Sequence, residues 1–549
     1  MKPLKKTTIM KVFLLCLVVG TAVYWSSAQE QANVYQVISK NLTVLGRIYQ
    51  EISKKYVDPV DPEKLFRSGI DGMLNGLDPY TTYIDEKDQE ELKISIQGQY
   101  EGVGLPLNFR NNQVTVAEPP FPETPSARAG VREGDRILKV DGVTTEQLGY
   151  AGTVQKIRGP AGTEVKLTIE REGETKVLEF VLIRERISVD VVRYSGVVNG
   201  VGYIRLDHFP RDAGAEMAGA IESLKARGAQ SFILDLRSNP GGLLESAIDV
   251  ASLFLPKGTL IVSDRGRTKE STQEFRSTRE PAFGSGRLAV LVNGYSASAS
   301  EIVAGAIQDH DRGVIVGDTT FGKGLVQNLV PISQNVSLKI TTAKYYTPSG
   351  RCIQKQTYSS IDTMDLDAAS LYYTQNGRTV HGGGGVAPDV LVPLPNVSDL
   401  VIDMNRKSLF FNYAVAYSNT HPKVDSSLVI SDGMMQDFKK YVKDKKYQYQ
   451  HPFEKNLAAM KEEARSRNYG PAFLKELGTL EQSMNQVKDA MFENSAKDIR
   501  VILRRELASK CFGAKAEVEI GLQDDPVFKK AVEILSDNKG YTETLALKK

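Results

Sequence analysis

The sequence is poor in cysteine, histidine and tryptophan. Its 549 residues include three cysteines, five histidines and one tryptophan. Three scattered cysteines exclude a disulfide-based scaffold, and the chain has no CxxC pair or His/Cys cluster typical of a zinc site. The net charge is only +2, so the composition gives no sign of a nucleic-acid-binding protein. We therefore expect neither a metal or other cofactor nor a nucleic-acid partner.

The N-terminus has the features of an export signal. Four lysines precede an apolar run over residues 12–25, and small residues follow up to Ala28. Such a run is short for a membrane span and typical of a signal peptide over residues 1–28. We expect cleavage after Ala28 and export to the periplasm or cell envelope, whereas an uncleaved signal would anchor the protein in a membrane. Cleavage would remove Cys16 and leave Cys352 and Cys511, whose pairing the sequence does not decide.

Four further regions follow from the patterns along the chain. Residues 29–95 show apolar residues at helical spacing, and residues 96–187 show short β-rich runs between turn signals. Residues 188–397 alternate strand and helix patterns, which predicts an α/β layer fold. Residues 398–549 are charged and mostly helical in pattern, which indicates a packing or partner-binding appendage. The helices at either end could each form a homo-oligomer, so the oligomeric state stays open.

Residues 317–324 (GDTTFGKG) place a lysine between two glycines, as in part of a nucleotide-binding P-loop. A P-loop needs a Ser or Thr after the lysine as a magnesium ligand, and a helix that begins there. Here Gly324 follows Lys323, and residues 325–330 have the pattern of a strand. The sequence therefore disfavours a nucleotide-hydrolysing enzyme.

A candidate nucleophile lies upstream of this loop. A buried strand over residues 288–292 ends in a turn of small residues, and a helix begins at Ser298, with Glu301 placed as in a capping box. A serine at such a turn can expose its hydroxyl near free helical N–H groups. A desolvated lysine can act as its base, and Gln327 could orient the amine of Lys323. A plain helix cap and a plain glycine turn are the alternatives.

A second glycine-rich turn supports this site. Residues 232–244 (FILDLRSNPGGLL) predict a buried strand, a Pro-Gly-Gly turn and a helix. Gly241 and Gly242 allow backbone N–H groups to approach a ligand closely. One of them could join the Ala299 N–H as an oxyanion donor, and the sequence does not decide which.

Together these motifs resemble the C-terminal processing peptidases, also called tail-specific proteases, over about residues 35–395. The carrying motifs stand in that family's order and spacing: residues 77–80, 234–242, 296–302, 317–324 with Gln327, and 346–351. The resemblance implies a Ser-Lys dyad with Ser298 as nucleophile, Lys323 as general base and Gln327 orienting the lysine. It also implies oxyanion donors at Ala299 and at Gly241 or Gly242, and a crotonase-like α/β spiral as the catalytic core. Asp309 matches an acidic position that we expect to be structural.

Residues 96–187 resemble a PDZ domain inserted before the core, most clearly in residues 127–142 (ARAGVREGDRILKVDG). Gly102, Val103 and Gly104 stand where a PDZ domain binds a peptide's C-terminal carboxylate. The implied partners are proteins or peptides with free C-terminal tails. Arg158 is either a link between this domain and the core or a solvated turn residue.

The sequence thus predicts an exported serine endopeptidase that recognises C-terminal tails and cleaves through an acyl-enzyme. The alternative is a catalytically inert PDZ scaffold of the cell envelope. Neither the substrate nor the cleavage preference follows from the sequence. It also does not say whether the PDZ domain activates or inhibits the core, or whether an activating partner is needed.

Overall fold

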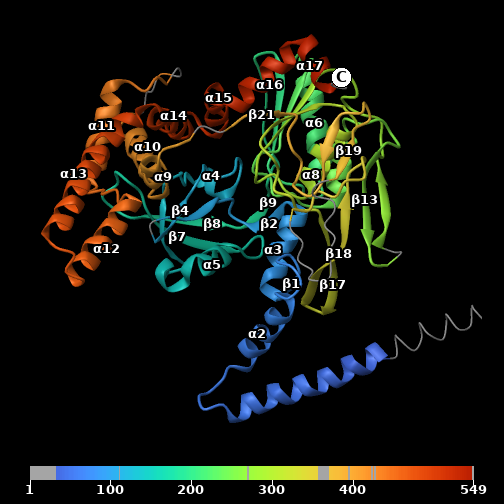
Figure 1. Cartoon of the computed structure of the whole chain (residues 1–549), viewed down its shortest axis with the longest axis horizontal. Coiled ribbons are helices and arrows are strands. Elements are labelled where there is room, and N and C mark those ends of the chain that lie inside the picture. Colours follow the sequence, from blue (N-terminus) through green and yellow to red (C-terminus); the bar gives the residue numbers. More distant parts are fainter. Residues whose placement is uncertain are drawn as a thin grey trace, which may run out of the picture. The chain divides into compact units, whose positions relative to one another are not determined.

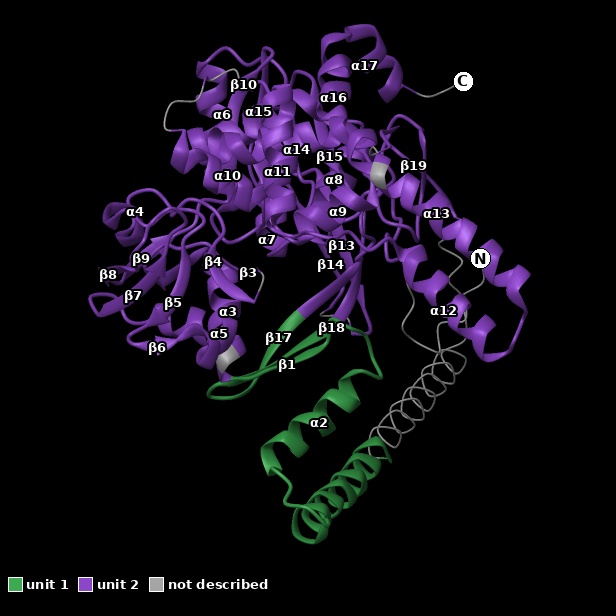
Figure 2. Ribbon diagram, turned by 90° about the vertical axis from the view of Figure 1, so that its left-hand side faces the viewer, with its two compact units in different colours: residues 1–85, 328–341 green, residues 86–327, 342–549 purple. Residues whose placement is uncertain are grey.

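The computed structural model describes residues 33–546 apart from 111, 269–270, 356–369, 394–395, 422–424 and 426–427 (Figure 1). The predicted signal segment, residues 1–28, lies outside them. Among the described helices, none combines the length and apolar character that a membrane span requires. The chain divides into two compact units, Met1–Asp85 with Asn328–Thr341, and Glu86–Gln327 with Thr342–Lys549 (Figure 2).

The first unit combines helices with a strand pair. Residues 33–55 are helical. The carboxylate of Asp61 caps α2 (Pro62–Leu74) by accepting two backbone N–H groups of its first turn. β1 (Thr82–Ile84) pairs antiparallel with the first part of β18 (Val336–Tyr346). The helical pattern at α2 is confirmed, whereas the three-residue strand β1 was not predicted because it is too short to show an alternating pattern.

A small β-domain opens the second unit, after α3 (Glu86–Gln97). Its main sheet has the order β3-β4-β5-β7-β8, with β6 beside β5, and β2 pairs with β9. Its strands are β2 (Gln99–Gly102), β3 (Leu107–Arg110), β4 (Gln113–Val116), β5 (Arg136–Val140), β6 (Val143–Thr144), β7 (Glu164–Glu170), β8 (Leu178–Ile183) and β9 (Glu185–Ser188). Its helices are α4 (Pro125–Ala129) and α5 (Thr145–Ile157). The predicted β-rich run is confirmed as β7, in which every second residue is buried.

The α/β core is built on a six-stranded sheet of order β10-β11-β12-β15-β16-β21, parallel from β11 onward. Its strands are β10 (Val192–Val198), β11 (Val201–Leu206), β12 (Phe232–Asp235), β15 (Leu288–Val292), β16 (Val314–Gly317) and β21 (Val390–Leu391). All residues of β12, β15 and β16 are buried, as is typical of a sheet covered on both faces. The α/β prediction is confirmed, with α6 (Ala213–Ala226) as one of the helices that alternate with the strands.

Different parts of the chain cover the two faces of this sheet. α6, α7 (Leu244–Ala251) and α8 (Ala299–Asp309) pack on the face that carries Ile204, Leu234 and Val290. The opposite face carries Tyr203, Ile233 and Leu291, and it is covered by α16 (Pro526–Ser536) and α17 (Asn538–Leu545) (Figure 1). The C-terminal region therefore contributes to the core of the α/β domain.

The other strands and helices of the second unit complete this frame. β13 (Leu260–Gly266) pairs with β14 (Gln273–Arg276) and with the end of β18, and β19 (Leu371–Tyr373) pairs with β20 (Thr379–His381). The helices after residue 398 are α9 (Asp399–Arg406), α10 (Leu409–Thr420), α11 (Asp432–Asp444), α12 (Pro452–Ser466), α13 (Pro471–Asn494), α14 (Ala496–Phe512) and α15 (Ala514–Asp524), followed by α16 and α17. The helical prediction is confirmed, although the pattern over residues 471–507 is two helices that meet at Ser495.

Candidate active site

Ser298 occupies a strained turn between β15 and α8. It is the N-cap residue of α8 and has φ 56° and ψ −114°, a conformation that is rare for a residue with a side chain. The residue is partly exposed. The turn thus presents the hydroxyl beside the first N–H groups of α8, including that of Ala299, which has no acceptor within the helix.

The buried carboxylate of Glu301 joins this turn to the lysine loop. Its Oε2 accepts the N–H of Ser298 at 2.8 Å and the N–H of Lys323 at 2.9 Å. Its Oε1 accepts the Gly322 N–H at 2.7 Å and the Thr320 hydroxyl at 2.6 Å. Burial raises the pKa of Glu301 to about 7, although these four hydrogen bonds favour the ionised form. The structure has the predicted capping box of Ser298 and Glu301, and the Glu301 carboxylate also reaches the lysine loop.

Tyr345, which is buried on β18, makes a second connection. Its hydroxyl hydrogen-bonds the Ser298 carbonyl at 3.1 Å and the Lys323 carbonyl as well. Glu301 thus holds the backbone N–H groups of the two candidate residues and Tyr345 holds their carbonyl groups. The structure therefore brings the Ser298 turn and the Lys323 loop together through two buried side chains.

Both glycines beside Lys323 are required by close packing. A Cβ on Gly322, which has φ +88°, would lie 2.7 Å from the Cβ of Lys355. A Cβ on Gly324 would lie 2.8 Å from the backbone nitrogen of Gln354. β17 (Leu325–Ser333) follows directly and carries Gln327. The loop leads into a strand, as predicted, and the helix that a P-loop needs is not there.

Asn239 organises the loop between β12 and α7 (residues 236–243), which we call the oxyanion loop after the role predicted for its glycines. Its side chain is fully buried, accepts the Gly241 N–H at 2.9 Å and donates to the Leu206 carbonyl at 2.8 Å. Its own carbonyl accepts the Ala297 N–H at 3.0 Å and the Ser300 hydroxyl at 2.9 Å. One asparagine therefore links the oxyanion loop to both sides of Ser298.

Gly241 and Gly242 have different environments in this loop. A Cβ on Gly241, where φ is +99°, would lie 2.7 Å from the Ala297 oxygen and 2.9 Å from the Ala299 nitrogen. Gly242 packs its Cα against Phe209 and is exposed. Within the described part of the chain, the Gly241 N–H donates to Asn239, whereas no acceptor is recorded for the Gly242 N–H.

Asp309 lies at the opposite end of α8 from Ser298. Its carboxylate pairs with the buried guanidinium of Arg351 at 2.8 Å and accepts the Ser349 N–H at 2.9 Å. These contacts favour the structural interpretation of Asp309. Cys352 is buried next to Arg351, and neither it nor Cys511 forms a disulfide within the described part of the chain.

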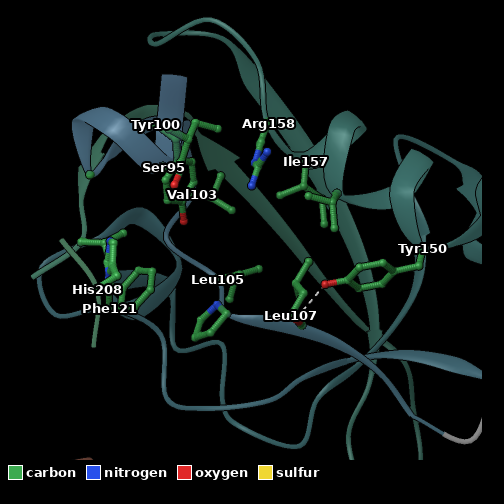
Figure 3. Close-up of a pocket in the computed structure, with 15 residues that line it drawn as sticks. Ser95, Tyr100, Val103, Leu105, Leu107, Phe121, Tyr150, Ile157, Arg158 and His208 are labelled. Carbon is green, nitrogen blue, oxygen red and sulfur yellow. Dashed lines mark hydrogen bonds between the residues drawn. The ribbon is translucent and has the colours of Figure 1, made fainter. Parts of the chain in front are cut away.

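The β-domain has a groove of about 370 Å³ between α5 and the segment that leads into β3 (Figure 3). Apolar side chains and one arginine make up most of its lining: Ile94, Val103, Leu105, Pro106, Leu107, Phe121, Val154, Ile157, Val189 and Arg158. The Tyr150 hydroxyl on α5 donates to the Leu107 carbonyl at 2.9 Å, across the groove (Figure 3). His208, from the loop after β11, also lines it, so the α/β core contributes to the groove.

The predicted carboxylate-binding loop adjoins this groove, although only Val103 of its three residues lines it. Gly104 has φ +80°, and a Cβ there would lie 2.4 Å from Thr124, so glycine is required. Gly102 packs against Tyr100, and the Arg158 guanidinium lies 5.4 Å from the centre of the Tyr100 ring. Burial raises the pKa of Tyr100 to about 12. Arg158 is therefore at the groove and is not merely a solvated turn residue.

The sequence patterns predicted no role for Asn239 or Tyr345, and for Glu301 they predicted only a helix cap. Asn239 lies inside the motif at residues 234–242, so its position was a usable signal. Tyr345 comes one residue before the motif at 346–351 and acts through contacts that no local pattern reveals.

Comparisons with known proteins agree with this organisation. Four family models match, described as Peptidase family S41 (residues 200–362), PDZ domain (120–171), Activating protease CtpB N-terminal domain (20–88) and Probable PDZ-protease, C-terminal helical domain (400–535). The carboxy-terminal-processing protease of Bartonella bacilliformis is 41% identical over 319 residues, which are 57% of this chain and 73% of that protein. The carboxyl-terminal-processing protease of Synechocystis sp. is 38% identical over 312 residues, 55% of this chain and 72% of that one. The solved photosystem II D1 C-terminal processing protease is 25% identical with a TM-score of 0.35, covering 63% of this chain and 86% of that one.

Proposed function

Because this chain belongs to the carboxy-terminal-processing proteases of peptidase family S41, we propose that it cleaves proteins through a Ser-Lys dyad of Ser298 and Lys323. The observation that carries the proposal is the Glu301 carboxylate, one oxygen of which binds the backbone N–H groups of both residues. Two residues of the right chemistry, far apart in sequence, are thereby held by one buried group. A plain helix cap and a plain turn have no need of this arrangement.

In the proposed first step, the Ser298 Oγ attacks the carbonyl carbon of the scissile peptide bond while the Lys323 Nζ takes the hydroxyl proton. The C–N bond then breaks, and Lys323 gives that proton to the departing amine. Water attacks the resulting acyl-ester, Lys323 accepts its proton, and the proton returns to Ser298 as the acid product leaves. Lysine serves as this base only when neutral, which desolvation by a covering substrate favours. Gln327, on the strand that follows, would orient the amine.

The developing oxyanion needs N–H donors that are not already used. The Ala299 N–H, at the start of α8, is one. For the other we propose Gly242, because the Gly241 N–H donates to Asn239, while Gly242 is exposed and the described residues offer its N–H no recorded acceptor. Gly241 then serves to let the oxyanion loop approach the Ser298 turn closely.

The PDZ groove supports recognition of C-terminal tails. A peptide could add as a strand beside β3, with its carboxylate at the N–H groups of residues 102–104 and its side chains among the apolar groove residues. We further propose that the protein is exported to the periplasm or cell envelope and that its core is related to the crotonase-like spiral. The proposal also includes two features that need separate tests, which are assembly into a homo-oligomer and activation by a partner protein.

The proposal is tested with the protein from residue 29 onward and a peptide that ends in a flexible apolar tail. Cleavage, followed by mass spectrometry, is expected from the unsubstituted protein and not from Ser298→Ala or Lys323→Ala. The same peptide with an amidated C-terminus is the control and should be cut more slowly. Equal cleavage by all three proteins would contradict the dyad. Tail binding without cleavage by any of them would favour the inert scaffold.

A further inference from the structure

The oxyanion loop is held from outside the α/β core by an ion pair. Arg237, the second residue of the loop, places its Nη1 2.6 Å from Oδ2 of Asp525. Asp525 lies between α15 and α16, in the C-terminal helical region. The two side chains are 19% and 16% exposed, so water screens this pair much less than it screens a surface ion pair.

Arg237 is also fixed from within the core. Its Nη2 lies 2.5 Å from Oδ2 of Asp235, and its backbone N–H donates to the other oxygen of Asp235 at 2.9 Å. The Tyr203 hydroxyl donates to Asp235 at 2.6 Å. Burial alone would raise the pKa of Asp235, yet Arg237 and these hydrogen bonds hold that pKa below its usual value. The guanidinium therefore lies between a carboxylate of the core and a carboxylate of the C-terminal region.

Few residues separate Arg237 from the proposed oxyanion donor, and those residues are constrained. Ser238 has φ 60° and donates its N–H to the Asn293 side chain at 2.9 Å. Asn239 is buried and makes the hydrogen bonds described above, and a proline precedes Gly241. Because these residues have little freedom to move, we expect that a shift of Arg237 would also shift the backbone N–H of Gly242.

The same C-terminal region also holds the PDZ domain. Lys510, near the end of α14, forms an ion pair with Glu133 of the PDZ domain, and both side chains are buried. A Cβ on Gly134 would lie 2.7 Å from a methyl group of Val415 on α10, so these surfaces are in close contact. The helices after residue 398 thus contact the PDZ domain at one end and the oxyanion loop at the other.

We propose that Asp525 is a positioning residue for proteolysis, which holds through Arg237 the loop that presents the Gly242 N–H to the oxyanion. The inference rests on the proposed Ser-Lys function. It gives residues 398–549 a part in organising the active site, in addition to packing on the sheet.

Asp525 also caps α16, because its Oδ1 accepts the N–H groups of Val527 and Phe528. Asparagine is an equally good N-cap residue, so Asp525→Asn keeps the cap and removes only the charge. Asp524→Asn is the matched control, since Asp524 is the neighbouring residue and pairs with Arg504 of α14 at 3.3 Å, not with the loop.

For Asp525→Asn we expect kcat to fall about tenfold with little change in KM, a fraction of the loss that follows complete removal of an oxyanion donor. Asp524→Asn should stay within twofold, and Asp525→Glu, which keeps the charge, should recover most of kcat. Melting temperatures, and tail binding in the Ser298→Ala background, should be equal for both asparagine variants. These two readouts separate positioning from a general loss of structure.

An Asp525→Asn protein with unchanged kcat, or a loss that appears equally in Asp524→Asn, would overturn the inference while Ser298-dependent cleavage stands. A loss confined to KM would overturn it too. If Asp525→Asn does not fold, Asp525→Ser, which also caps the helix, and Asp525→Glu carry the same comparison. An unsubstituted protein without Ser298-dependent cleavage would overturn the proposed function, and this inference with it.

Discussion

The Ser298 turn and the oxyanion loop follow neighbouring parallel strands, β15 and β12, and each leads into a helix, yet different parts of the chain hold them. The Ser298 turn is held by Glu301 and Tyr345, both within the α/β core. The oxyanion loop depends in addition on Arg237 and its ion pair with the C-terminal region. Side chains within residues 188–397 thus hold the Ser298 turn, whereas the oxyanion loop is held in addition by the C-terminal region, whose α16 also packs on the core sheet.

The largest effect should come from Glu301→Gln, which breaks the support of the Ser298 turn. The amide NH₂ would face donors that now share a carboxylate, and losing two acceptors at 1–3 kcal/mol each predicts a kcat about a thousandfold lower. Steady-state kinetics on the tailed peptide measures it. Glu245→Gln is the control, because Glu245 is the exposed glutamate in the first turn of α7. Equal effects of the two changes would contradict the role of Glu301.

Gly241→Ala tests the contact between the two turns. The new Cβ would meet the Ala297 oxygen and Ala299 nitrogen at less than 3 Å, at φ +99°. We expect kcat to fall about a hundredfold and the free energy of unfolding to fall by about 2–4 kcal/mol. Gly294→Ala is the control in the other turn, since its Cβ would have only the Thr319 oxygen near it, at 3.8 Å. If Gly241→Ala changes neither kcat nor the free energy of unfolding by much, the close contact between the oxyanion loop and the Ser298 turn is not required.

The contact between Glu133 and Lys510 provides a measure of how firmly the C-terminal region, which also holds the oxyanion loop, docks on the PDZ domain. Burial is the main reason that the pKa of Glu133 is raised from 4.5 to about 7. The neighbouring Lys510 lowers this pKa in part, whereas Glu506 and Glu517 raise it further. The docked state therefore binds a proton that the undocked state releases between these values, so docking weakens as pH rises from about 4.5 to 7.

Hydrogen exchange measures this docking. We expect the protection of residues 505–512, after correction for the intrinsic pH dependence of exchange, to fall about tenfold between pH 5 and pH 7.5. Glu133→Gln should abolish this dependence, whereas Glu506→Gln, which changes a more exposed neighbour, should keep it. Protection that rises over this pH range would contradict the assigned direction.

The smallest effect concerns binding rather than catalysis. Tyr150→Phe removes the hydrogen bond to the Leu107 carbonyl, a group that an added peptide strand would need. At about 0.5–1.5 kcal/mol for one hydrogen bond, tails should bind about threefold more tightly with kcat unchanged. Fluorescence anisotropy in the Ser298→Ala background measures this, with the exposed Tyr469→Phe as control. Weaker binding would mean that Tyr150 contributes to recognition rather than closing the groove.

The sequence predicted the parts of the site that have a local signature. Strands β12 and β15 were recognisable as apolar runs between turn residues, and Ser298 and Lys323 stood out because glycines and small residues surround them. The residues that hold these parts were not predictable in the same way. Tyr345 and Asp525 act on Ser298 and Arg237 across long separations in the chain, and neither lies in a pattern that periodicity or turn chemistry would reveal. Local sequence patterns thus predict the strands and turns of the site. The contacts that hold these parts in place come from residues far apart in the chain and could not be predicted in this way.

The second face of the core sheet is covered by α16 and α17, among the last residues of the chain. During synthesis, the strands next to Ser298 and Lys323 emerge well before the helices that cover the other face of the sheet. The apolar face with Tyr203, Ile233 and Leu291 therefore stays uncovered until α16 and α17 have been made and have folded onto it.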